Sequence, residues 1–239
     1  MTHILKTIPI EGGKSIKLKL TKHQIKYIVS EVIEDRCYFP KIKNKDFEIK
    51  DGDTVIDIGG NVGVFAVYAS KLTPKGKVYS FEPVKNNFHW LEENKKLNNA
   101  NNLILENKAI SDSTKKVKIH LEKLNSGGHS FYKEKYEKLG EAVRSTEIIE
   151  AISLKEVFDK YDIKKCDFLK IDCEGEEYNL LKALPSKYFE KINKIAIEFH
   201  PNVDEIALAR HLRKMGFKVT IYNLDEILGM IFARKKKKS

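Results

Sequence analysis

The amino-acid sequence predicts a doubly wound α/β fold with a mainly parallel sheet, and three observations carry this prediction. After Pro40, short apolar segments alternate with amphipathic segments of helical period, as in chains built from strand–helix–strand units. The first of these apolar segments breaks into a glycine-rich turn, which is typical of a ligand-binding loop in such folds. A chain of 239 residues with 41% hydrophobic content is also long enough to bury a substantial core. Repeated strand–helix connections imply right-handed crossovers and a sheet covered on both faces.

The first 40 residues are predicted to form an extension ahead of the main domain, which we place at residues 41–239. Residues 3–20 show two alternating strands around the hairpin signal Glu11-Gly12-Gly13-Lys14. Thr21 is a suitable N-cap for a helix that continues to about Asp35. We therefore expect this extension to lack a core of its own.

Within the main domain, the alternation predicts strands, helices and a closing hairpin. Strands are expected at 54–58, 77–81, 103–106, 167–171 and 194–199, and helices at 62–72, 84–97, from 153 onward, at 176–184 and at 203–215. The closing hairpin, from residue 217, makes at least one edge strand antiparallel. Residues 115–151 interrupt the rhythm with two strands and a loop rich in Ser, Gly, Lys and Tyr, which we interpret as an insertion near the ligand edge.

Charge and cysteine content limit the partners and the compartment. The 44 Lys and Arg residues outnumber the 34 Asp and Glu residues, and the net charge of +10 would suit RNA or an acidic membrane surface. The terminal lysines at 235–238 are expected to be a solvated tail. The three cysteines form no CxxC pair, and no apolar run is long enough for a membrane span or a signal peptide. We therefore expect a cytoplasmic protein without a transmembrane segment.

The glycine-rich turn lies in the segment VIDIGGNVGVF, where a buried strand ends and a helix begins. Glycines allow a ligand to touch the backbone, and the helix N-terminus offers N–H groups to a carboxylate or phosphate. Ile58 stands where a dinucleotide fingerprint needs glycine, Asp57 would repel a pyrophosphate, and no GK[ST] follows. S-adenosylmethionine fits better, because its methionyl end carries an ammonium for Asp57 and a carboxylate for the turn amides. The donor-binding residues predicted here are Asp57, Gly59, Gly60, Asn61 and Gly63.

Two later segments complete the predicted donor site. The next strand ends in Phe81-Glu82-Pro83, and Glu82 is placed to accept hydrogen bonds from both ribose hydroxyls. The segment at 107–112, which begins Asn107-Lys108-Ala109, could supply backbone and small side-chain contacts to an adenine, and a plain loop is the alternative.

Together these residues resemble the FkbM-type branch of class I methyltransferases. VIDIGGNVGVF, SFEP, NKAISD, the SGGHS loop and DFLKIDCEGEEYNLL occur in the family's order, over about residues 30–200. The resemblance implies a Rossmann-like class I fold with a seven-stranded sheet, S-adenosylmethionine as donor, and generally O-methylation of small molecules, sugars or glycan-like acceptors. It places the donor loop at Asp57, Gly59, Asn61 and Gly63, the ribose acid at Glu82, and the DxEGxE segment at Asp172, Glu174, Gly175 and Glu177. Gly60, where many relatives have alanine, and Cys173, which replaces a common aliphatic residue, are departures.

Candidate catalytic residues follow the fourth and fifth strands. Asp172 and Glu174 could contact the donor or the acceptor, act as a base, or help to bind a divalent ion. Because a metal ion needs more ligands than these two carboxylates, no metal site is predicted. His200 shares strand parity with Glu198, and its neutral imidazole could take a hydroxyl proton near pH 7. The SGGHS loop at 126–130 is expected to close over donor or acceptor, or to be a flexible surface loop.

The methyl acceptor is predicted by elimination. The sequence has no [DN]PP[YFW] motif for amino-group methylation and no Pro-Cys nucleophile for cytosine C5, which leaves oxygen as the favoured acceptor atom. A small-molecule or glycan hydroxyl is the leading hypothesis. The alternatives are RNA, bound through the basic surface, and a donor-binding regulatory protein without turnover, against which the intact acids Asp57, Glu82 and Asp172 argue.

Overall fold

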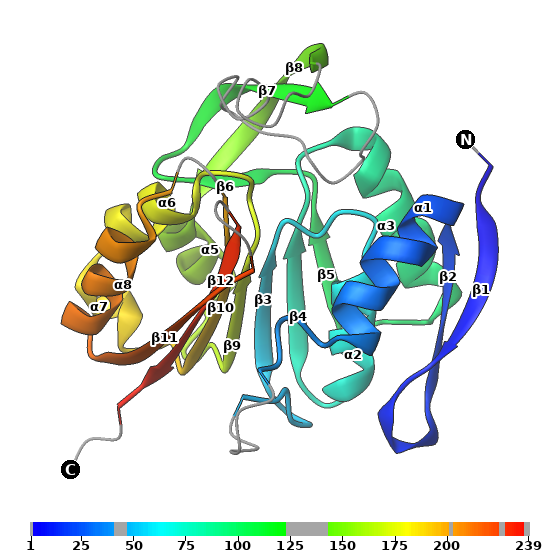
Figure 1. The fold of residues 1–239 in the computed structure, drawn as a ribbon, viewed down its shortest axis with the longest axis horizontal. Helices are drawn as coiled ribbons and strands as arrows, with labels where there is room; N and C mark the ends of the chain where they lie inside the picture. Colours follow the sequence, from blue (N-terminus) through cyan, green and yellow to red (C-terminus); the bar gives the residue numbers. More distant parts are fainter. Residues whose placement is uncertain (1, 41–46, 123–142, 201–202, 225–227, 237–239) are drawn as a thin grey trace. The chain divides into compact units, whose positions relative to one another are not determined.

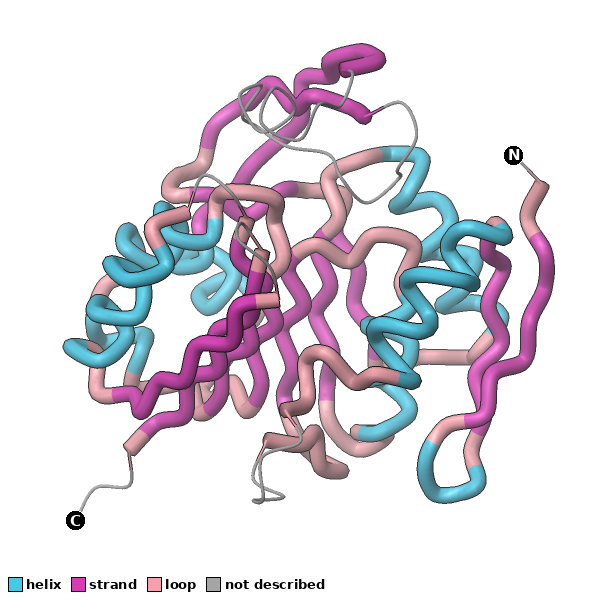
Figure 2. Tube along the Cα trace, in the orientation of Figure 1, coloured by secondary structure: helices cyan, strands magenta, loops and turns pink. Residues whose placement is uncertain are grey.

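Strands and helices alternate in the order that the sequence predicts. A computed structural model describes residues 2–40, 47–122, 143–200, 203–224 and 228–236. The chain divides into two compact units, residues 1–107 and 108–239. Figure 1 shows the elements in chain order, and Figure 2 distinguishes helices from strands.

The first unit contains three parallel strands with two crossover helices. Strands β3 (Thr54–Ile58), β4 (Lys77–Phe81) and β5 (Leu103–Glu106) pair in the order β3-β4-β5. Helices α2 (Val64–Leu72) and α3 (Lys85–Leu97) connect them. All three strands have their predicted bounds, because each is an apolar run between turn signals.

The N-terminal hairpin packs on the first unit through one face of its second strand. Strands β1 (Ile4–Pro9) and β2 (Ser15–Leu20) pair antiparallel around a short 3-10 turn, η1 (Glu11–Gly13). Alternate residues Ile16, Leu18 and Leu20 of β2 are fully buried. The hairpin is therefore tied into the core of the unit, as its alternating pattern requires.

The helix that follows the hairpin begins as predicted but is wound differently. Thr21 accepts a hydrogen bond from the Gln24 N–H, and Gln24 bonds back to the Thr21 N–H, which makes a capping box. The short helix α1 (Lys22–Gln24) leads into the π-helix η2 (Ile25–Glu34). Its last N–H, that of Asp35, bonds to the Ser30 carbonyl five residues earlier.

The second unit combines parallel and antiparallel strands. Strand β9 (Phe168–Ile171) is parallel to β10 (Lys194–Phe199), which pairs antiparallel with β12 (Gly229–Lys235), and β12 pairs antiparallel with β11 (Phe217–Asn223). The antiparallel closing hairpin is thereby confirmed. The first unit supplies three strands and the second four of the seven that the family resemblance implies.

In the described part of the second unit, four helices accompany these strands. They are α5 (Leu154–Lys160), α6 (Glu177–Ala183), α7 (Ser186–Phe189) and α8 (Glu205–Lys214). Ser153 caps α5 in a capping box with Glu156, at the predicted start. Helix α7 was not predicted, because it follows Pro185 as a single turn, too short for a periodic signal.

The interruption in the alternation is a separate three-stranded sheet. The two predicted strands are β7 (Lys115–Glu122) and β8 (Val143–Ser153), which pair antiparallel, and β6 (Ala109–Ser111) adds to β8 in parallel. Part of the segment predicted to touch adenine is therefore a strand and not a plain loop. The SGGHS loop at 126–130 lies outside the described residues.

The start of the basic terminal run is not a solvated tail. The Lys235 side chain, in β12, donates hydrogen bonds to the carbonyls of Phe189 and Met215 and to the Glu190 carboxylate, at 2.9–3.2 Å. Its ammonium also lies 4.9 Å from the centre of the Phe217 ring. This expectation was wrong for Lys235, because three acceptors and an aromatic face hold the side chain in place. Among the described residues, no helix is long and apolar enough to span a membrane.

Candidate functional site

The glycine-rich turn joins β3 to α2 and is held by the neighbouring strand. Three of its residues have positive φ: Gly59 (82°), Asn61 (47°) and Gly63 (90°). The N–H groups of Gly59 and Gly60 both donate to the carbonyl of Phe81, at 3.0 and 2.9 Å. The Phe81 side chain is 1% exposed, so this residue supports the turn through its backbone.

Beneath the turn, Asp57 and Ser80 form a buried pair. Ser80 Oγ donates to Asp57 Oδ2 at 2.7 Å, and both side chains are inaccessible to solvent. A Cβ atom on Gly60 would lie 2.3 Å from Ser80 Oγ. Glycine at this position therefore leaves room for the Ser80 hydroxyl.

Glu82 braces the turn at the end of β4. Its Oε2 accepts from the Asn61 N–H and its Oε1 from the Val84 N–H, both at 2.8 Å. The Asn107 side-chain amide donates to the carbonyls of Glu82 and Pro83, at 2.8 and 3.0 Å, and fixes the chain that carries Glu82.

Asn61 presents a buried polar atom at the same turn. Its Oδ1 has no hydrogen-bond partner within the described part of the chain. A buried acceptor left in this state is costly unless a ligand satisfies it. The turn thus presents an acceptor suited to a donor group on a ligand.

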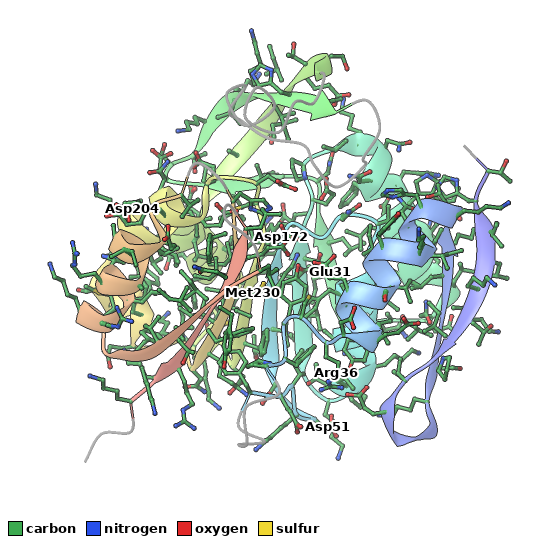
Figure 3. All side chains as sticks on the ribbon, in the orientation of Figure 1. Glu31, Arg36, Asp51, Asp172, Asp204 and Met230 are labelled. Carbon is green, nitrogen blue, oxygen red and sulfur yellow. The ribbon has the colours of Figure 1, made fainter. Side chains whose placement is uncertain are left out.

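In the second unit, the register of β9 against β10 brings several charged side chains close together. Ala196 of β10 is paired with Lys170 of β9, and both strands run in the same direction. Because side chains alternate across a strand, Lys170 and Asp172 share one face with Glu198 and His200. Asp172 follows the last residue of β9 directly (Figure 3).

These residues, together with Glu174 and Glu177, form what we term the acid–histidine cluster. His200 Nε2 lies 3.1 Å from Glu174 Oε2, 3.8 Å from Asp172 Oδ1 and 4.0 Å from Glu198 Oε1. The nearly buried Lys170 ammonium lies 3.3 Å from Asp172 Oδ2. One imidazole nitrogen therefore faces three carboxylates.

Glu177, the first residue of α6, orients the histidine from its other side. His200 Nδ1 lies 2.8 Å from Glu177 Oε1, and the Glu177 side chain is fully buried. The same carboxylate accepts hydrogen bonds from the N–H groups of Gly175 and Cys173. It thus holds the turn on which Glu174 sits with a φ of 58°.

The protonation of His200 differs from the sequence-based expectation. Burial alone would lower the pKa of His200, but the carboxylates of Glu174 and Glu177 outweigh it and raise this pKa to about 10. The imidazole is therefore charged at pH 7 in this arrangement. A neutral His200 that accepts a hydroxyl proton does not fit it, because the surrounding carboxylates stabilise the imidazolium.

The predicted site residues are divided between the two units. Asp57, Gly59, Gly60, Asn61, Gly63, Phe81, Glu82, Pro83 and Asn107 belong to the first unit, whereas Ala109, Asp172, Glu174 and His200 belong to the second. Ala109 is buried in β6. Lys170 was not among the candidates, and Glu177 was known only as part of a motif, although strand parity could have identified Lys170.

Comparisons with known proteins agree with this fold. The family model described as the methyltransferase FkbM domain matches residues 57–228. Methyltransferase 1 of Beauveria bassiana is 22% identical over 223 residues, which cover 85% of each chain. Hexuronic acid methyltransferase AglP of Haloferax volcanii is 28% identical over 187 residues, 75% of this chain and 70% of that protein. Among solved structures, the fibrillarin pre-rRNA processing protein of Methanococcus jannaschii gives a TM-score of 0.54 at 12% identity, over 99% of this chain and 90% of that one.

Fold and family thus define an S-adenosylmethionine-dependent methyltransferase with the Rossmann-like class I fold. The chain belongs to the FkbM methyltransferase domain family. Its predicted class, fold and family are confirmed.

Proposed function

We propose that this enzyme methylates a hydroxyl oxygen of a small molecule or sugar, with S-adenosylmethionine as the donor. The acid–histidine cluster carries this proposal, because carboxylates at the ends of two parallel strands can accept hydrogen bonds from several acceptor hydroxyls. The name of one relative, a hexuronic acid methyltransferase, supports a sugar-like acceptor.

The first unit fits the donor. The buried Asn61 Oδ1 and the Asp57 carboxylate at the glycine-rich turn suit the donor's ammonium group. Glu82, whose carboxylate is held at the turn by the N–H groups of Asn61 and Val84, would accept from the two ribose hydroxyls. Pro83, Asn107 and Ala109 remain candidates for contacts to the adenine.

The second unit fits the acceptor. The bound donor supplies a methyl group on a sulfonium, so the acceptor oxygen bonds to the methyl carbon while the carbon–sulfur bond breaks and S-adenosylhomocysteine leaves. The hydroxyl proton passes to a carboxylate, Asp172 or Glu174, since His200 already carries a proton. Lys170 and His200 stabilise that carboxylate as an anion before the transfer.

The cluster argues against RNA as the acceptor. Four carboxylates, those of Asp172, Glu174, Glu177 and Glu198, surround two cations, and a phosphate backbone would be repelled there. The net charge of +10 is the one observation that favours RNA. RNA binding through that charge would weaken steeply as the salt concentration rises.

A labelled-donor assay tests the proposal. Uronic acids, neutral sugars, small phenols and total RNA are incubated with the full chain and methyl-labelled S-adenosylmethionine, and label is counted in each fraction. We expect label in a hydroxyl compound, and the product should resist mild alkali because it is an ether. An alkali-labile product would mean carboxyl methylation, and label confined to RNA would contradict the proposal.

A further inference from the structure

We propose that Asp172, Glu174 and His200 form a binding site for one divalent cation, and that this cation holds an acceptor with two neighbouring oxygen atoms. The second part rests on the proposed function. The cation site itself rests on the geometry of the second unit alone.

The spacing of the ligand atoms fits an octahedral cation. One side-chain atom from each of the three residues lies within 4.8 Å of the other two. His200 Nε2 is 3.1 Å from Glu174 Oε2 and 3.8 Å from Asp172 Oδ1. Ligands at about 2.1 Å from one cation lie about 3 Å apart along an octahedral edge, so small side-chain movements would complete the site.

The orientation of His200 is a separate indication. The side chain is 5% exposed, and Glu177 engages Nδ1 from behind, which leaves Nε2 directed at the carboxylates. Histidines that bind metals usually have the other ring nitrogen held by a carboxylate or carbonyl in this manner. Glu177 is itself fixed by backbone N–H groups, so the imidazole is preoriented.

The charge balance also favours a cation. Each of the four carboxylates of the cluster lies within 4.0 Å of the Lys170 ammonium or of the His200 imidazole. A divalent cation bound between Nε2 and these carboxylates would neutralise part of their negative charge.

The ligand set indicates the kind of metal and of acceptor. Two carboxylates and one imidazole suit Mn²⁺ or a similar divalent ion, with Glu198, whose Oε1 is 4.0 Å from Nε2, as a possible fourth ligand. An octahedral ion with three or four protein ligands keeps two or three open positions. Two adjacent acceptor oxygens, as in a vicinal diol or a hydroxyl beside a carboxylate, would fill them and bring one hydroxyl into a fixed orientation.

Titration with Mn²⁺ tests the site without donor or acceptor. The full chain is freed of metal with a chelator, and Mn²⁺ binding is followed by electron paramagnetic resonance and calorimetry. We expect one strong site per chain, weakened tenfold or more by Glu174→Gln or His200→Gln and about 10–100-fold by Glu177→Gln. Glu176→Gln is the matched control, because Glu176 is in the same turn but bonds to Ser111 Oγ at 3.0 Å.

Pulsed electron paramagnetic resonance on the unaltered protein tests the cation site even if a variant does not fold. Coupling of bound Mn²⁺ to a histidine nitrogen is expected. Absence of strong Mn²⁺ binding, absence of that coupling, or site variants that bind like Glu176→Gln would overturn the cation site. Mn²⁺ binding without methyl transfer to any hydroxyl would instead contradict the proposed function, and transfer that persists in the metal-free protein would contradict the role of the cation.

Discussion

The side-chain amide of Asn94, on α3, donates a hydrogen bond to the carbonyl of Val62 in the glycine-rich turn at 2.8 Å. The same side chain accepts from the N–H of Lys19 in β2 at 2.7 Å, so one residue joins the N-terminal hairpin to the turn. Asn98, one helical turn later, bonds to the backbone of Lys17 in β2 but not to the glycine-rich turn. The hairpin therefore acts on the turn through Asn94.

This relationship predicts different effects for two similar substitutions. Asn94→Ala and Asn98→Ala should each lower the free energy of unfolding by about 1–3 kcal/mol, because buried backbone groups lose partners. Only Asn94→Ala should also weaken S-adenosylhomocysteine binding, since it alone releases Val62. Calorimetry with that ligand, on both folded variants, measures the difference. Equal affinities would show that the hairpin does not support the donor turn.

Gly60 and Ser80 should behave as a coupled pair. Gly60→Ala places a Cβ atom 2.3 Å from Ser80 Oγ, and we expect a loss of about 1–3 kcal/mol in the free energy of unfolding from overpacking. Ser80→Ala removes the clashing oxygen but also a hydrogen bond to buried Asp57. The double variant should therefore lose less free energy of unfolding than the two single variants lose together. Chemical denaturation of all four proteins measures this difference. Simple additivity would mean that the turn moves away from Ser80.

Glu82→Ala should weaken donor binding by roughly 1.5–3 kcal/mol, because a charge-assisted pair of hydrogen bonds to the ribose is lost. Glu82 also braces Asn61 and Val84, so the variant's melting temperature without ligand must be measured beside its affinity. Glu93→Ala, at an exposed acid paired with Lys96, is the control. An unchanged dissociation constant in a folded Glu82 variant would remove Glu82 from the donor site.

Local pattern was enough to predict most elements. Strands 54–58, 77–81, 103–106 and 194–199 have the predicted bounds, and Thr21 and Ser153 cap helices as expected. These signals depend on neighbours within a few residues. The π-winding of η2 and the three-residue strand β6 have no comparable local signal, since each depends on contacts made elsewhere in the chain.

The acid–histidine cluster shows where sequence reasoning was incomplete. Asp172, Glu174 and His200 were identified one by one from their positions after strands. Their assembly depends on the register of β9 against β10, which the sequence does not state. For this reason the protonation of His200 was misjudged and Glu177 was not recognised as its partner.

The C-terminus provides a stability test of Lys235. Truncation after Arg234 removes the three side-chain hydrogen bonds of Lys235, the bond of its N–H to the Asn193 carbonyl and its contact with Phe217. It should lower the melting temperature by several degrees, as a loss of about 1–2 kcal/mol does. Truncation after Lys236 keeps these contacts and the bond of the Lys236 N–H to the Gly216 carbonyl, and should leave stability unchanged. Scanning calorimetry compares the two. Equal melting temperatures would mean that the Lys235 contacts contribute nothing.

Asp172 should affect turnover and not the fold. Its carboxylate lies at the end of β9, 26% exposed, between the Lys170 ammonium and the His200 imidazole. Asp172→Asn keeps the shape of the side chain but removes its charge, so it can no longer accept the acceptor's proton or bind a cation strongly. We expect turnover to fall about tenfold or more, the low end of the cost of a lost proton-transfer group. Asp162→Asn, at an exposed acid paired with Lys164, should turn over at the original rate. Single-turnover kinetics with saturating donor separates this effect from donor binding. An unchanged rate for Asp172→Asn would show that the reaction centre does not lie at the acid–histidine cluster.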